Sequence, residues 1–92
     1  MDSVINPING ISYIQLGKII VVYITLTISG ITNIPIPVPR GMFTVTFRDN
    51  DNGNLATFWI GIDGNVTSIQ VFHAVNYTSG NKYSGMFSYI AK

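Results

Sequence analysis

Few side chains in this sequence could carry out a reaction. There is one histidine, His73, and the four acidic residues are all aspartates. A nucleophilic serine would need His73 as its base, yet no serine stands in a Gly-x-Ser-x-Gly motif or another activating context. Asp49, Asp51 and Asp63 fall at expected hairpin tips, where water surrounds a carboxylate, whereas a catalytic acid needs a pKa raised by burial. We therefore expect no catalytic residues, no cofactor and no enzymatic activity.

A metal site is also not expected. The segment Asp49-x-Asp51-x-Gly53 places oxygen ligands at a spacing that calcium loops use. The glycine at the sixth place of such a loop and the glutamate at the twelfth are missing, and Ile60 stands at the latter. The chain has no cysteine, so thiolate metal sites are excluded. The segment is interpreted as a polar turn.

Aromatic rings beside planar polar side chains are what a saccharide site uses. We expect a shallow site of this kind to be formed by Arg48, Asp49, Trp59, His73, Asn76 and Tyr77. Trp59 falls on the opposite side of its strand from Phe58 and Ile60, so it stands outside the main core. It could instead pack in a subunit interface, and His73 could simply be a solvated histidine.

Strands must position these side chains, because apolar and polar residues alternate along much of the chain. The alternation predicts strands over 18–29, 43–48, 57–63, 69–73 and 83–90, and a shorter one over 12–15. No segment shows helical spacing over ten residues. The sequence therefore predicts one all-β domain over residues 1–92, a small antiparallel β-sandwich or barrel of about six to eight strands. Residues 1–9 are expected to form a loose N-terminal segment.

The sequence also predicts the turns and loops that connect the strands. Asp63-Gly64-Asn65 predicts a tight hairpin, residues 49–54 a polar hairpin tip, and residues 76–82 a long exposed loop. Residues 34–39 carry proline at every second position, so the segment is expected to be an extended connection or a sheet edge.

The charge content is low for a small protein. Charged residues make up 10% of the chain and hydrophobic ones 47%, whereas an average soluble domain has about 25% charged residues. The strand that follows Lys18 is apolar on both sides at its start. Apolar area beyond one small core needs a partner, so we expect a homo-oligomer, with residues 34–38 as a contact region.

Two other classes of partner are excluded by the sequence. The net charge of +1 comes from scattered residues and offers no basic face for nucleic acid. The apolar stretch over 19–38 is interrupted by Gly30, Asn33 and Pro35, so no membrane insertion is expected.

Four segments taken in order resemble the C-terminal head domains of tailed-phage receptor-binding proteins, in tail fibres and baseplates. They are GKIIVV at 17–22, IPIPVPRG at 34–41, IGIDGNV at 60–66 and YSGMFSYI at 83–90. The resemblance implies a homotrimeric head at the phage tail tip, facing the outside of the virion. It implies binding of a host cell-surface saccharide or teichoic acid, and attachment to other tail or baseplate proteins.

Two expectations remain open. Residues 1–9 are too short for a fibre shaft, so we expect either an excised head or a separately encoded tip. The alternative function is a structural module that trimerises or caps a fibre and has no ligand of its own. A saccharide site needs Trp59, His73 or Tyr77 open to solvent beside polar side chains, whereas an assembly module would bury them between subunits.

Overall fold

The computed structural model describes residues 2–8, 10–64 and 66–92, without the side chains of residues 2–8, 63, 72 and 73. This part of the chain forms strands and turns and contains no helix. The strands are β1 (Asp2–Ile8), β2 (Ile11–Leu16), β3 (Ile19–Thr27), β4 (Thr32–Ile34), β5 (Phe43–Asp49), β6 (Leu55–Asp63), β7 (Val66–Val75) and β8 (Lys82–Ile90). The all-β class and the strand number predicted from the sequence are confirmed.

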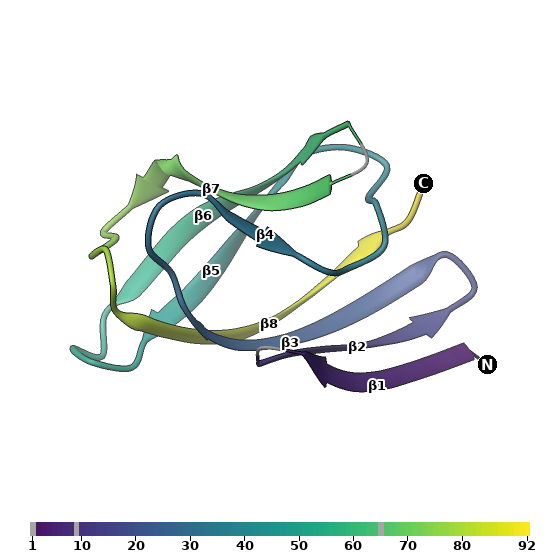
Figure 1. The fold of residues 1–92 in the computed structure, drawn as a ribbon, viewed down its shortest axis with the longest axis horizontal. Helices are drawn as coiled ribbons and strands as arrows, with labels where there is room; N and C mark the ends of the chain where they lie inside the picture. Colours follow the sequence, from purple (N-terminus) through teal and green to yellow (C-terminus); the bar gives the residue numbers. More distant parts are fainter. Residues whose placement is uncertain (1, 9, 65) are drawn as a thin grey trace.

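All eight strands belong to one antiparallel sheet, in the order β1-β2-β3-β8-β5-β6-β7-β4. The sheet curls into a half-barrel. One layer contains β1, β2, β3 and β8, and the other contains β4 to β7 (Figure 1). Each layer has an inner face turned toward the other layer and an outer face turned away from it.

The two layers are joined at a narrow junction. β5 and β8 pair only through Arg48 with Ser84 and Asp49 with Tyr83, whereas β3 pairs with β8 along nine residues. Beyond the junction β5 and β8 diverge (Figure 1). An isolated bridge between Pro39 and Ala91 lies outside the named strands. The space between the diverging strands is where the core forms.

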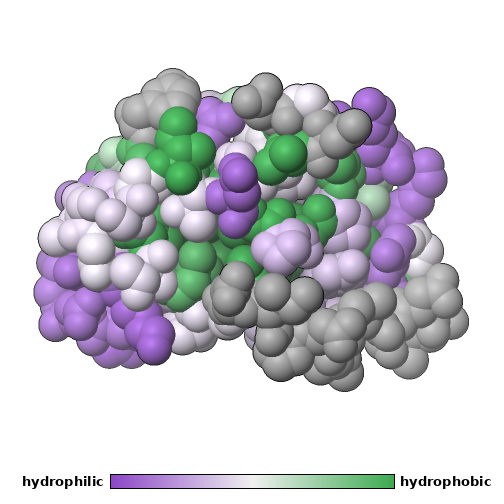
Figure 2. Space-filling model, in the orientation of Figure 1, coloured by the Kyte–Doolittle hydropathy of each residue, from purple (hydrophilic) through white to green (hydrophobic). Residues whose placement is uncertain are grey.

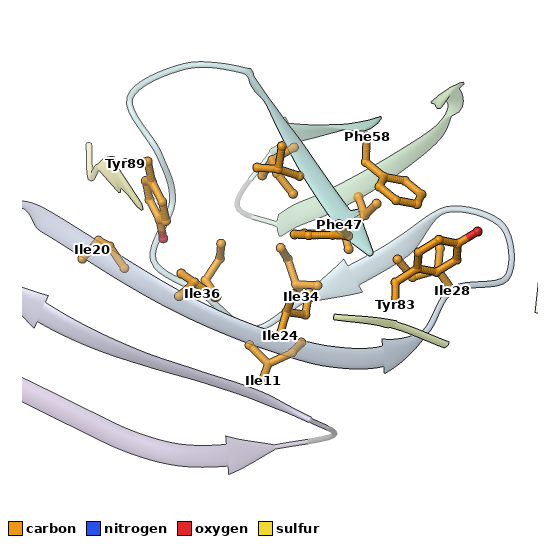
Figure 3. Packing of buried hydrophobic residues seen from close by; sticks show 14 of the residues in the cluster. Ile11, Ile20, Ile24, Ile28, Ile34, Ile36, Phe47, Phe58, Tyr83 and Tyr89 are labelled. Carbon is orange, nitrogen blue, oxygen red and sulfur yellow. The ribbon is translucent and has the colours of Figure 1, made fainter. Parts of the chain in front are cut away.

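Alternate residues of the strands fill this space. Ile20, Val22 and Ile24 of β3 are buried from one layer, and Phe47 and Phe58 are fully buried from the other (Figure 3). The ring centroids of Phe47 and Phe58 lie 5.5 Å apart, within the range of favourable aromatic pairs. Period-two alternation in the sequence is therefore what separates inner from outer side chains.

The N-terminal segment differs from the prediction. Residues 2–8 form β1, which pairs with β2 and makes one edge of the sheet. The register shifts between Val4 and Ile8, an interval that contains Pro7. Proline has no N–H to donate, which accounts for an interruption of the pairing. The edge of β2 offers backbone groups that need partners, which accounts for the pairing of residues 2–8 with it.

The proline-rich segment is extended and begins at the other edge, as predicted, because β4 pairs only with β7. Its role as a subunit contact is not supported, since Ile34 and Ile36 are 3% and 8% exposed and lie in the core. The hydroxyl of Tyr89 also donates a hydrogen bond to the carbonyl of Pro37. Ile34 and Ile36 therefore pack within their own chain.

The core leaves no room for a side chain at Gly85 of β8. A methyl group there would lie 2.6 Å from Cδ1 of Phe47, so the ring would have to move. We expect Gly85→Ala to lower the free energy of unfolding by about 1–3 kcal/mol, as overpacked cores do. Gly41→Ala is the control, because a methyl group there has nothing within 4 Å. Equal denaturant midpoints for the two variants would contradict this packing.

Candidate functional site

Asp49 lies at the junction of the two layers, at the end of β5, and its side chain is fully buried. Its Oδ1 accepts hydrogen bonds from the backbone N–H groups of Asp51 (2.8 Å) and Asn52 (3.3 Å). Its Oδ2 accepts one from Nδ2 of Asn81, at 2.9 Å. The expectation of a solvated carboxylate available to a ligand is therefore wrong, because the turn of residues 50–52 folds back over it.

The surroundings of this carboxylate keep it ionised. Burial alone would raise the pKa of Asp49, but hydrogen bonds outweigh it and hold the pKa below the ordinary aspartate value. The donors are the side chain of Asn81 and the backbone N–H groups of Asp51 and Asn52. Hydrogen bonds to the charged form have this effect. Asp49 therefore works as a structural anion that ties the β5–β6 turn to the loop before β8.

The side chain of Tyr77 also makes its contacts within the chain. Its hydroxyl donates to the carbonyl of Ile28 (3.0 Å) and accepts from the N–H of Gly30 (3.1 Å). Its half-buried ring packs edge-on against Phe58, with centroids 5.5 Å apart. Tyr77 therefore braces the connection between β3 and β4 and is not an open stacking ring.

Arg48 and Trp59 lie on the outer face of the β5–β6–β7 layer. On β5, Thr44, Thr46 and Arg48 are exposed while Val45 and Phe47 are buried. Trp59 of β6 is half-buried and stands between Thr44 on β5 and Gln70 on β7. We call the set Thr44, Thr46, Arg48, Thr57, Trp59 and Gln70 the Trp59 face. Arg48 lies four residues from Thr44 along β5. Its backbone is therefore about 13 Å from that of Thr44, the residue paired with Trp59.

Gln70 was not predicted as a site residue, and Gly61 explains where its side chain lies. A methyl group on Gly61 would be 2.2 Å from Nε2 of Gln70 and 3.1 Å from Cε of Met42. The amide of Gln70 therefore lies across Gly61, against the sheet and next to the level of Trp59. The sequence motif Asp63-Gly64-Asn65 was the available signal, because the hairpin that it predicts sets the pairing of Trp59 with Gln70.

Asn76 and His73 complete the predicted set. Asn76 is exposed, has a φ of 62° and turns the chain directly after Val75, the partner of Thr57. It therefore lies toward the same end of the layer as Arg48. His73 belongs to β7, and its side chain is outside the described part of the structure. The structure thus places Arg48 and Trp59 on one face and turns Asp49 inward.

A groove that the sequence did not predict lies between β3 and β4, where the half-barrel remains open. Its volume is about 550 Å³, and its lining residues are Gly10, Ile11, Thr25, Leu26, Thr27, Thr32, Asn33, Pro35 and Lys82. Its lining combines threonines, Asn33 and Lys82 with the apolar residues Ile11, Leu26 and Pro35. We call it the β3–β4 groove.

Within the described residues, no three histidine or acidic side chains gather in a way that could hold a metal ion. The same residues contain no helix of the length and apolarity needed to cross a membrane. No family model matches the chain, and no curated protein matches it. The function must therefore be argued from the surfaces themselves.

Asp49→Asn tests the role of the buried carboxylate. We expect a loss of stability, because an amide in this place has one oxygen to accept hydrogen bonds instead of two. The folded-state pKa is lowered, so the carboxylate's contribution is complete above the unfolded value of about 3.9 and disappears as the pH falls through the folded pKa. The gap in unfolding free energy between the wild type and Asp49→Asn should therefore narrow below about pH 4.

Asp51→Asn is the matched control. Asp51 is exposed and accepts one hydrogen bond, from the N–H of Lys82, which an amide oxygen can also accept. Denaturant titrations above and below about pH 4 give the free energy of unfolding of the wild type, Asp49→Asn and Asp51→Asn. A stability gap for Asp49→Asn that is independent of pH would contradict the assignment.

Proposed function

We propose that this protein is a non-catalytic receptor-binding head of a phage tail fibre or baseplate, which holds a bacterial cell-surface saccharide on the Trp59 face. One observation carries the proposal. A half-buried indole stands on the outside of a rigid sheet, between a hydroxyl at Thr44 and an amide at Gln70. Rigid strands that present a few polar groups around an apolar surface are typical of binding sites.

The chemistry of this face fits a sugar. The apolar side of a pyranose ring packs on an aromatic face, and a planar amide pairs with neighbouring hydroxyls. Arg48 lies further along the face and is exposed. A guanidinium binds phosphate through two parallel hydrogen bonds, so a phosphate-containing polymer such as teichoic acid suits a ligand that extends from Trp59 toward Arg48.

The face is shallow, so each site should bind weakly. One aromatic contact with a few hydroxyl hydrogen bonds gives dissociation constants in the roughly millimolar to micromolar range. Several copies held together raise the effective affinity by about a hundredfold or more without any new contact. A head of this kind is therefore expected to work as an oligomer.

Trp59→Ala tests the proposal. Binding of the tagged protein to intact bacteria and to purified cell-wall polysaccharides, teichoic acids included, should fall at least about tenfold, which corresponds to about 1.4 kcal/mol. Thr27→Ala, on the rim of the β3–β4 groove, is the control and should bind as the wild type does. Circular dichroism shows whether both remain folded.

The proposal fails if Trp59→Ala binds at wild-type strength. Loss of binding in Thr27→Ala alone would move the ligand to the β3–β4 groove. No binding by any form to any of these probes would favour the second candidate, a structural trimerisation or capping module of a fibre. That candidate is supported by apolar side chains exposed on the other layer, among them Ile19, Tyr23 and Met86.

A further inference from the structure

We infer that the outer face of β2, β3 and β8 is the surface through which copies of this chain associate. The strand registers line up three rows of side chains across these strands. The first row is Leu16, Ile19 and Ile90, the second Ile14, Val21 and Ser88, and the third Ser12, Tyr23 and Met86. Seven of these nine side chains are apolar. We call the nine residues the apolar face.

The larger side chains of the apolar face are open to solvent in the single chain. Leu16, Ile19, Tyr23, Met86 and Ile90 are between 42% and 60% exposed. Their inner-face neighbours are buried, with Ile20 and Val22 at 0% exposed. Both sides of β3 are thus apolar near its start, and its own chain covers only one of them.

No charged residue stands in the three rows. The lysines nearest in sequence are Lys18, in the turn before β3, and Lys82 and Lys92, near the two ends of β8. A different protein is usually selected through complementary charges or polar groups in the interface. A second copy needs none, because a two-fold axis brings the same patch against itself. The face therefore points to a two-fold contact, which differs from the three-fold contact expected of a homotrimer. The composition of the face therefore points to another copy of this chain.

The size of the face fits a weak contact with this occupant, formed at high concentration. Three strands about 4.8 Å apart and three rows about 6.7 Å apart cover roughly 300 Å². A stable interface needs about 500 Å² or more from each partner, with an apolar centre and a polar rim. Thr25 and Ser84 form the next row on the same outer side of β3 and β8, and the charged Lys82 lies beyond them at the start of β8, so the rim at this end is polar. Two such sheet faces would stack about 10 Å apart.

The Trp59 face is the matched comparison within the same molecule. Its strands present Thr44, Thr46, Arg48 and Thr57 to the outside, beside the exposed apolar side chains of Leu55 and Val75. The polar 49–54 tip of the same layer appears as a hydrophilic region in Figure 2. The Trp59 face thus mixes hydroxyls and a guanidinium with apolar side chains, whereas the three rows of the apolar face hold no charge. The inference holds whether or not the Trp59 face binds a saccharide.

Light scattering with size-exclusion chromatography at high micromolar concentration tests the inference. The wild type should be an oligomer, and Tyr23→Lys and Met86→Lys should each shift it to the 10.1 kDa monomer by weakening association at least tenfold. Tyr23→Thr and Met86→Ser repeat the test should the lysine variants not fold. Thr46→Lys adds the same charge on the Trp59 face and should stay oligomeric.

Each other outcome overturns the inference. A monomeric wild type, or oligomers that persist in the folded Tyr23 and Met86 variants, would exclude the apolar face as the contact. Dissociation of Thr46→Lys to the same extent would show a general effect of charge. A wild type that is monomeric but sediments with phosphatidylcholine vesicles would assign the face to a lipid surface. Trp59→Ala should remain oligomeric, which separates this test from that of saccharide binding.

Discussion

The buried carboxylate of Asp49 is the constraint on which the arrangement of the two layers depends. β5 and β8 share only two residue pairs, and Asp49 belongs to one of them. Its hydrogen bonds join the β5–β6 turn and the loop before β8 in a single network. A charged carboxylate without a cation is tolerable in a protein interior when several N–H donors surround it. The network therefore holds together strands that diverge immediately beyond it.

This divergence gives each strand a buried side and an outward side, and the outward sides differ between the layers. The apolar face of β2, β3 and β8 and the polar Trp59 face of β5 to β7 belong to a single sheet. We propose that one face serves association between copies and that the other binds an oxygen-rich ligand. Such a division would let each copy in an assembly carry its own exposed binding face.

Much of the fold could be predicted from the sequence, because alternation determines which residues of a strand point inward. Strand order could not, since Thr32–Ile34 pairs with Val66–Val75 across a long stretch of chain. The site was less predictable. Asp49 looks like a solvated turn residue by its type, and Tyr77 looks like an exposed loop aromatic. Their hydrogen-bond partners, such as Asn81 and Ile28, are distant in sequence and adjacent only after folding.

Cross-saturation NMR on an oligomer assembled from labelled and unlabelled copies tests the division of the two outer faces most directly, without any substitution. Irradiating the unlabelled copies should attenuate the methyl signals of Leu16, Ile19 and Ile90 strongly, while those of Thr44 and Thr46 keep their intensity. Attenuation at Thr44 and Thr46 with unchanged signals from Leu16, Ile19 and Ile90 would contradict the account.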